Sequence, residues 1–299
     1  MRREALASIL YLIALSTAAG CFALRPRHPA NQEMARGQMQ PPAPDPLPKI
    51  EPPPPPTPKE TPAQPVVRSE DSQLRRLANK ALEKEKTLNS YICRLRRRER
   101  PSGKSEPMEV IMVKYRRSPF SIHFKWLGEE NKGREIIYVK GQHDDKIQLL
   151  TGQGDWIGPG HYLEFASDSE LLKSRSRYPI QEGGIGAAVL RFGALLDAVE
   201  RGQPNAGSLR YLGRKTRAEF PTPLETVEQA VVPGVESLLP KGGTRYIYFE
   251  ETSNLPLLIQ TYDHNQNEVE YYCFDRLQTP VPLDDADFDP VKLWPGAKK

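Results

Sequence analysis

The chain has 299 residues, and its 42 lysines and arginines against 38 aspartates and glutamates give a net charge of only +4. Nucleic-acid-binding proteins usually carry a strong and clustered basic excess, so this near balance argues against that class. The length is enough for one large domain or two small ones.

The N-terminus has the organisation of a secretory signal peptide. Arg2 and Arg3 precede a mostly apolar run over residues 5–14, and small residues follow at positions 18–20. This pattern predicts a cleaved signal over residues 1–20. The apolar run is too short to cross a hydrocarbon layer of about 30 Å as a helix.

Cys21 follows the small residues directly, which resembles the lipobox of bacterial lipoproteins. The resemblance implies that the Cys21 thiol receives a diacylglycerol and becomes the N-terminus of an exported, membrane-anchored chain facing the periplasm. Two features depart from the pattern: Ala18 stands where leucine is usual, and Glu4 lies in the charged region. The alternative is an ordinary signal followed by a chance cysteine.

Residues 21–70 are predicted to be the lipidated N-terminus and a disordered, proline-rich tether. Half of the 30 prolines lie within residues 26–65. Proline lacks the backbone donor and fixes φ, so this stretch favours extended polyproline II without a core. At about 3.1 Å per residue it could reach on the order of 140 Å. A ligand for another protein is the alternative role.

A folded domain is predicted over residues 71–291, followed by a tail over residues 292–299. From Ser72 onward, apolar residues return at steps of three and four, which predicts a helix with one apolar stripe. The stripe consists of Leu74, Leu77, Ala78, Ala81, Leu82 and Leu88. The period then changes to two, which predicts strands over residues 91–96, 108–116, 121–127, 134–140 and 146–150.

The middle of the chain predicts helices over residues 167–173 and 187–199. Strands then return over residues 209–215, 226–231, 245–249, 257–262 and 268–274. About ten strands with short connections indicate one antiparallel sheet, and a sheet of that size curls. The predicted fold class is mainly β (α+β): a curved antiparallel half-barrel with an N-terminal helix and a helical insertion.

This order of elements resembles the bacterial domain of unknown function family 1571, found in planctomycete-type bacteria. That family is similar to the LolA/LolB-like carriers that sort outer-membrane lipoproteins. The matching strings are residues 176–180 (Ser-Arg-Tyr-Pro-Ile) running into 183–186 (Gly-Gly-Ile-Gly), residues 248–257, residues 262–269 and the closing residues 287–290 (Asp-Phe-Asp-Pro). One departure is that the soluble carrier is not itself lipidated, whereas this chain is expected to be.

The resemblance implies an apolar pocket for acyl chains between the half-barrel and a helical lid. The residues expected to face it are Ile122, Phe124, Trp126, Ile136 and Tyr138 from the sheet, with Leu74, Leu77 and Leu82 from the lid helix. The same residues would also serve as plain core.

The sequence offers no catalytic or metal-binding pattern. No two of the five histidines have the helical i,i+4 spacing of metal ligands, and there is no Cys-x-x-Cys or Gly-x-Ser-x-Gly. Asp285, Asp287 and Asp289 alternate as in a calcium loop, but Pro290 stands where that loop needs glycine. We therefore expect no enzyme and no cofactor.

Two segments have an alternative binding role. The glycines at residues 183–186 precede a helix, where exposed amides bind anions, although a flexible entry loop is favoured. Arg94, Arg96 and Arg98 alternate on one strand face, which favours a solvated outer face over a site for anionic lipid or cell-wall polymer.

Cys93 and Cys273 lie in the first and last predicted strands, and export favours disulfides. If those strands are neighbours, a disulfide would close a loop of about 180 residues and remove about 5 kcal/mol of unfolded-state entropy. Two separate buried thiols are the alternative.

Together these features favour a non-enzymatic envelope protein that binds a lipid, an acylated client or another amphiphile. The alternative is a structural or interaction module with a filled barrel, whose surface docks an envelope protein or polymer. An envelope hydrolase lacks a visible nucleophile–base pair. We expect a monomer without a nucleic-acid partner.

We predict that Cys21→Ser releases the protein from membranes, because the lipid is the expected anchor. Cell fractionation measures this directly. If the variant stays membrane-bound and its processing is unchanged, the lipid anchor is wrong.

Overall fold

A computed structural model describes residues 69–100, 106–169 and 176–298 of the chain. The predicted signal over residues 1–20, Cys21 and the tether up to residue 68 lie outside these described residues. Of the helix predicted over residues 167–173, positions 167–169 form a turn and the rest lies outside the described residues.

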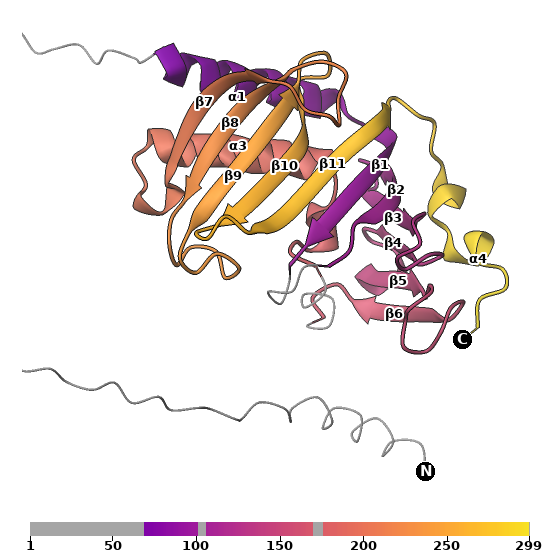
Figure 1. Cartoon of the computed structure of the whole chain (residues 1–299). Helices are drawn as coiled ribbons and strands as arrows, with labels where there is room; N and C mark the ends of the chain where they lie inside the picture. Colours follow the sequence, from indigo (N-terminus) through magenta and orange to yellow (C-terminus); the bar gives the residue numbers. More distant parts are fainter. Residues whose placement is uncertain (1–68, 101–105, 170–175, 299) are drawn as a thin grey trace, which may run out of the picture. The chain divides into compact units, whose positions relative to one another are not determined.

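The described residues are mainly β (Figure 1). The strands are β1 (Ser90–Glu99), β2 (Glu109–Arg116), β3 (Ser121–Trp126), β4 (Glu135–Val139), β5 (Lys146–Leu150), β6 (Tyr162–Ala166), β7 (Ser208–Lys215), β8 (Leu224–Val231), β9 (Gly243–Glu250), β10 (Leu255–Asp263) and β11 (Glu268–Gln278).

Two long helices accompany the strands. The helices are α1 (Ser69–Thr87), α3 (Ile185–Glu200), the single turn α4 (Pro290–Leu293) and the short 3-10 helices η2 (His143–Asp145), η3 (Ile180–Glu182), η4 (Pro204–Ala206) and η5 (Asp285–Phe288). Across the described ranges, no helix has both the length and the apolar character needed to cross a membrane.

All these strands belong to one antiparallel sheet in the order β6-β5-β4-β3-β2-β1-β11-β10-β9-β8-β7. The chain builds one half of the sheet before α3 and the other half after it. The first and last strands join the halves, with Arg96 opposite Cys273 and Glu99 opposite Glu270. The predicted fold class is therefore confirmed.

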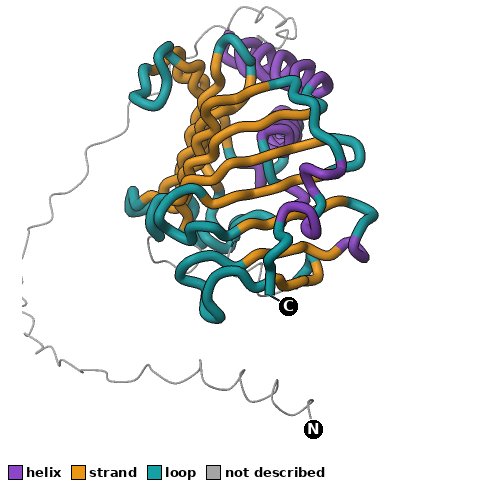
Figure 2. The backbone as a smooth tube through the Cα atoms, turned by 90° about the vertical axis from the view of Figure 1, so that its right-hand side faces the viewer, coloured by secondary structure: helices purple, strands orange, loops and turns teal. Residues whose placement is uncertain are grey.

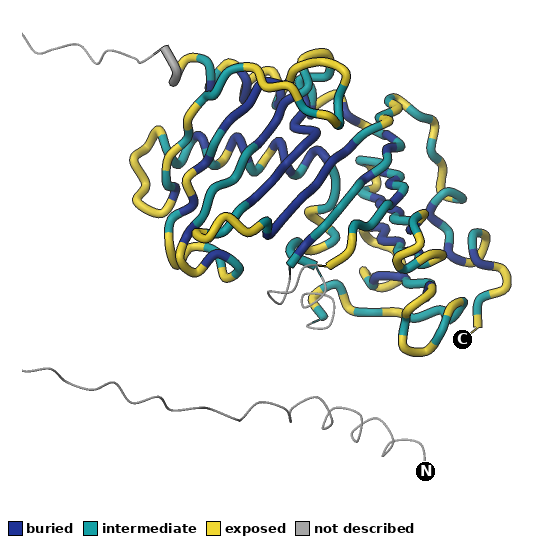
Figure 3. The backbone as a smooth tube through the Cα atoms, in the orientation of Figure 1, coloured by how far each residue is buried: buried dark blue, intermediate teal, exposed yellow. Residues whose placement is uncertain are grey.

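The sheet curves around α1 and α3, which both lie on its concave side (Figures 1 and 2). Their apolar stripes cause this placement, because each stripe must be removed from water. Leu74, Ala78 and Ala81 of α1 are buried, as are Val189 and Phe192 of α3. The central strands of the sheet contain long buried stretches (Figure 3).

The convex side of β3–β5 is covered by the C-terminal segment. Phe288 and Trp294 pack with Ile137 and Val139 of β4. The backbone N–H of Lys298 donates a hydrogen bond to the carbonyl of Gly160, just before β6, at 2.8 Å. Residues 292–298, assigned above to a tail, are thus part of the domain, because Trp294 supplies apolar cover for the sheet.

β6 is the strand that the sequence analysis missed. It is a short edge strand that pairs only with β5, and it follows a loop rich in glycine and proline. Leu163 and Phe165 do alternate with Glu164, so a period-two signal was present.

The predicted disulfide between Cys93 and Cys273 is wrong. The first and last strands are neighbours as expected, but both thiols are free and buried. Cys93 faces the concave cluster with Tyr91 and Leu95, whereas Cys273 faces the convex side, where Arg96 Nη2 donates to its Sγ at 3.2 Å. Residues on opposite faces of one sheet cannot be bridged without moving the backbone.

We therefore expect both thiols to react when the Cys21→Ser protein is denatured without reductant and treated with a maleimide. Mass spectrometry should show two adducts, on the peptides that contain Cys93 and Cys273. A disulfide-linked pair of these peptides would restore the bridge.

Candidate functional site

The eight residues predicted for an apolar pocket lie together in one cluster on the concave side of the sheet. Those that are buried are Leu74, Leu77, Ile122, Trp126 and Tyr138, and those that are half-buried are Leu82, Phe124 and Ile136. The sequence therefore predicted their common location correctly, and their function stays a proposal.

Strand register brings the sheet members of this cluster side by side. Ile122 and Phe124 of β3 lie opposite Tyr138 and Ile136 of β4. Because side chains alternate along a strand, all four point to the concave side. The period of two in this part of the sequence thus becomes a continuous apolar surface.

The two helices form one tightly packed layer over the other half of the sheet. A Cβ added at Gly193 of α3 would lie 3.3 Å from Leu82 Cδ1 of α1. Such close approach needs a residue without a side chain, so Gly193 fixes how near α1 and α3 can come. The layer contacts the sheet through side chains and donates no ladder hydrogen bonds to it.

Polar contacts hold the ends of this helical layer. The hydroxyl of Tyr91 accepts the N–H of Ile185 at 3.0 Å, at the start of α3. Arg117 Nη2 pairs with Glu85 Oε1 at 2.6 Å and donates to the carbonyl of Leu88 beyond α1. Arg117 therefore satisfies carbonyl groups at the C-terminal end of α1.

These contacts bear on the glycines at residues 183–186. The first amide of α3 already donates to Tyr91, and Glu85 Oε1 lies 3.3 Å from where a Cβ of Gly186 would be. Since a carboxylate already stands at this helix start, the geometry favours the structural role of the segment over anion binding.

Residues 176–184, here called the crossover segment, cover the concave side of β1–β3. A Cβ at Gly183 would lie 3.0 Å from Ile122 Cδ1 and 3.1 Å from Phe124 Cζ. The Tyr178 ring lies 6.0 Å from the ring of Tyr272 in β11. The crossover segment thus packs directly on the predicted pocket residues.

Two hollows lie beside α1, and the pocket residues contribute little to either. The first, of about 90 Å³, is lined by Arg76, Leu77, Lys80, Arg214, Glu225, Phe249, Glu250, Glu251 and Asn254. The second, of about 470 Å³ and broadly open, is lined by Asn79, Lys80, Glu83, Lys84, Thr87 and Asn254. Leu77 is the one predicted pocket residue that lines either of these two hollows.

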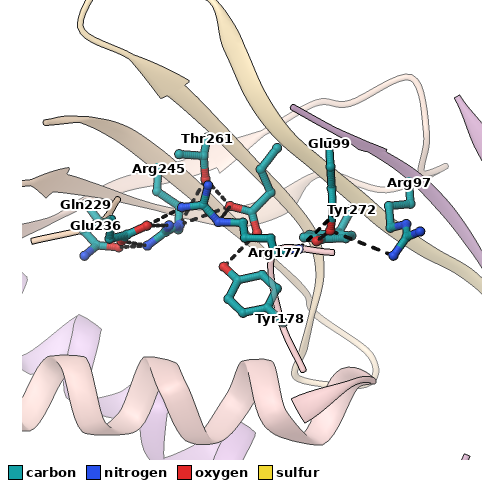
Figure 4. Close-up of polar contacts among 10 residues, drawn as sticks. Arg97, Glu99, Arg177, Tyr178, Gln229, Glu236, Arg245, Thr261 and Tyr272 are labelled. Atoms are coloured by element: carbon teal, nitrogen blue, oxygen red, sulfur yellow. Dashed lines mark hydrogen bonds and ion pairs between the residues drawn. The ribbon is translucent and has the colours of Figure 1, made fainter. Parts of the chain in front are cut away.

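A buried charged layer adjoins the apolar cluster on the same concave side (Figure 4). Its members come from β1, β8, β9, β10, β11, the loop between β8 and β9, and the crossover segment. They are Arg97, Glu99, Arg177, Tyr178, Gln229, Glu236, Arg245, Thr261, Glu270 and Tyr272.

Glu236 and Glu270 organise the charged layer. Arg245 Nη2 lies 2.8 Å from Glu236 Oε2, and Arg177 pairs with the same carboxylate. Both arginines also lie 3.6 Å from Glu270 Oε2, which accepts the Thr261 hydroxyl at 2.6 Å. Two carboxylates therefore hold two guanidinium groups between strands and crossover segment.

The ion pairs favour the charged forms of Arg177, Arg245 and Glu236 and so shift the pKa of each group. Burial acts to lower the pKa of the Arg177 and Arg245 side chains, but nearby Glu270 and Glu236 raise both above the ordinary value. Burial acts to raise the pKa of Glu236, and Arg245 and Arg177 lower it. At Glu99 burial prevails, and the pKa lies above its usual value.

The charged layer was not predicted from the sequence, although the sequence contains a signal for it. Arg245, Thr261 and Glu270 stand in phase with the inward-facing Ile247, Ile259 and Tyr272 of the same strands. A charged residue in the apolar phase of a strand predicts a buried polar contact. Their partner Glu236 lies in a loop and could be placed only by the fold.

A second buried polar group lies on the convex side. His123 Nε2 is 2.7 Å from Glu135 Oε2, and Lys125 Nζ is 2.8 Å from Glu135 Oε1. Trp294 donates its indole N–H to Glu135 at 3.0 Å. His123 alternates with the inward-facing Ile122 and Phe124 of β3, and it contacts the same Glu135 Oε2 atom as Trp294.

The outer arginines and the C-terminal aspartates take part in structural pairing. Arg94 and Arg96 lie on the convex face and pair with Asp275 at 2.7 and 3.2 Å. Asp287 pairs with Lys114 at 2.6 Å, and Asp289 caps α4. Within the described residues, no group of three or more histidine, cysteine, aspartate or glutamate side chains is arranged to hold a metal ion.

Comparison with known proteins assigns the domain to a family. The family model described as "Protein of unknown function (DUF1571)" matches residues 88–293. A comparison with curated protein sequences found no match.

Several solved structures are similar to part of this chain. MucB is similar over 73% of this chain and 62% of its own, at 13% identity and a TM-score of 0.45, so this chain spans less than two thirds of it. The lipoprotein LppX of Mycobacterium tuberculosis is similar over 72% of this chain and 100% of its own, at 13% identity and a TM-score of 0.41. A LolA superfamily protein of Nitrosomonas europaea is similar over 72% of this chain and 97% of its own, at 8% identity and a TM-score of 0.33.

Glu135 makes stability depend on acidity in a predictable direction. Burial acts to raise its pKa, but hydrogen bonds from His123, Lys125 and Trp294 outweigh burial and lower the pKa from 4.5 to about 2. A carboxyl group whose pKa is lower in the folded than in the unfolded state stabilises the fold at pH values above its unfolded-state pKa. This stabilisation is lost as the pH falls through the folded-state pKa, and for Glu135 the free energy of unfolding should fall by about 3 kcal/mol between roughly pH 5 and pH 2.

We expect Glu135→Gln to remove this part of the pH dependence in urea unfolding measured from pH 7 to pH 2. The exposed Glu130→Gln serves as a control and should keep it. An unchanged pH dependence in Glu135→Gln would contradict the assignment.

Proposed function

The chain belongs to the DUF1571 family of proteins of unknown function, and from that premise we propose an exported, membrane-anchored module that is not an enzyme. It holds the apolar chain of a lipid, acylated client or other amphiphile between the sheet and the α1/α3 layer. Cys21 carries the anchor, and residues 22–70 act as the tether.

One observation carries the proposal: a single apolar cluster joins a curved sheet to a helical layer that shares no backbone ladder with it. Separating the two layers exposes apolar side chains but leaves the strand hydrogen bonds intact. The polar contacts of Tyr91 and Arg117 lie at the ends of the helical layer. The layer can therefore open as a unit.

The free energy lost by exposing the leucines of α1 and the free energy gained by burying an acyl chain are of similar size. Exposing three leucines such as Leu74, Leu77 and Leu82 costs about 5–9 kcal/mol, at 1.5–3 kcal/mol for each buried side chain. Burying about ten methylene groups of an acyl chain returns about 8 kcal/mol. A chain of ordinary lipid length thus offsets the exposure of these three leucines, whereas a short one does not.

The docking module with a filled barrel is the second candidate. The observation that favours it is the packing of the apolar cluster, in which Ile122 has no exposed surface and Trp126 only 3%. In that case the interior is plain core, and a partner binds elsewhere on the surface. Lipid binding by the purified chain separates the two candidates.

We expect Leu77→Trp to abolish binding of the uncharged methyl ester of a fluorescent fatty acid, because the larger ring occupies the space beneath α1 that a ligand chain would enter. The measurement is probe titration of the Cys21→Ser chain, with the fold checked by circular dichroism.

Leu190→Trp is the matched control, since Leu190 of α3 is 53% exposed and the same change there leaves the interior as it is. The control should bind the probe normally. If the natural sequence binds no probe, the carrier proposal fails and the docking module takes its place.

A further inference from the structure

The apolar cluster and the charged layer meet at two tyrosines. Tyr178 and Tyr272 both contribute their rings to the apolar cluster. The hydroxyl of Tyr178 donates to Glu270 at 2.9 Å, and the hydroxyl of Tyr272 donates to Glu99. The concave interior is therefore divided, with an apolar part under the helices and a polar part beyond the tyrosines.

Arg177 lies at this boundary, and one of its hydrogen-bond donors is unpaired among the described residues. Its side chain is only 6% exposed, and its guanidinium carbon lies 5.8 Å from the centre of the Tyr178 ring. Its Nη2 and Nε atoms face Glu236 and Glu270. Its Nη1 atom is buried and has no hydrogen-bond partner in the described part of the chain.

A buried donor without an acceptor is unfavourable, so Nη1 is a place where an added acceptor is stabilising. The charges nearby decide which kind of acceptor fits. Within the charged layer, the three guanidinium groups of Arg97, Arg177 and Arg245 face the three carboxyl groups of Glu99, Glu236 and Glu270. Because these charges are balanced, an anionic ligand group would leave a negative charge without a partner, whereas an uncharged oxygen would not.

We propose that Arg177 Nη1 recognises an uncharged carbonyl oxygen, the ester or amide that joins an acyl chain to its head group. This inference rests on the proposed function: the acyl chain lies in the apolar cluster, and its first polar atom reaches the tyrosine boundary. Lipid esters and the amide of an acylated protein share this chemistry.

The test uses the mature chain with Cys21→Ser and the uncharged dye N-phenyl-1-naphthylamine as the bound probe. Four competitors with matched chains displace it: methyl laurate, N-methyl lauramide, tridecane and laurate. We expect the ester or the amide to compete on the order of tenfold better than tridecane and laurate, as one hydrogen bond to a charged donor provides. Stronger competition by the ester indicates a lipid ligand, and stronger competition by the amide indicates an acylated protein.

Arg177→Lys keeps the positive charge beside Glu236 and Glu270 but removes Nη1, so it should bind the dye normally and lose the preference for carbonyl compounds. Arg191→Lys is the matched control, because Arg191 also lies over the Tyr178 ring, at 4.3 Å, but is 37% exposed. It should keep the preference.

The outcomes separate this inference from the proposed function. If the natural sequence binds neither dye nor competitors, the carrier function fails and the inference with it. If the dye binds but tridecane or laurate competes as well as the ester and the amide, the carbonyl assignment is overturned while the carrier function stands. This comparison uses the natural site alone, so it decides the question even if Arg177→Lys does not fold.

Discussion

The pairing of β1 with β11 is the contact on which the rest of the structure depends, because it joins the half of the sheet built before α3 to the half built after it. It makes one sheet wide enough to curve around α1 and α3. It also brings Glu99 of β1 opposite Glu270 of β11, which creates the charged layer. The same register sends Cys93 and Cys273 to opposite faces, so the pairing that suggested a disulfide is what prevents it.

The attachment of the helices follows from this arrangement. A sheet that closes its own hydrogen bonds needs only apolar cover on its concave side, and α1 and α3 provide it through side chains. Backbone ladders lose hydrogen bonds when they separate, whereas side-chain layers lose contacts that a ligand can replace. The fold therefore puts the weaker attachment between sheet and helices, which is where a carrier has to open.

Local periodicity predicted what depends on one element at a time. The alternation of Ile122, Phe124 and Trp126 gave the concave face of β3, and the stripe from Leu74 to Leu88 gave the buried side of α1. It failed where a distant segment decides the environment. His123 and Trp294, far apart in the chain, meet at Glu135, and Arg177 contacts Glu236 and Glu270 only because the crossover segment lies over the sheet. The alternation along β9 and β11 predicts that Arg245 and Glu270 point inward, but it does not predict which residues they contact.

The charged layer is hard to explain as a source of stability. Desolvating ions costs about as much as their attraction returns, and well-packed apolar residues of similar volume are often as stable or more so. Extending the apolar cluster with such residues at Arg177, Arg245 and Glu270 would have filled the same space. Charged groups there instead end the apolar interior at Tyr178 and Tyr272. In the proposed function, a boundary of this kind limits how far an apolar chain enters and gives its polar end a fixed position, which is a role for the charged layer other than stability.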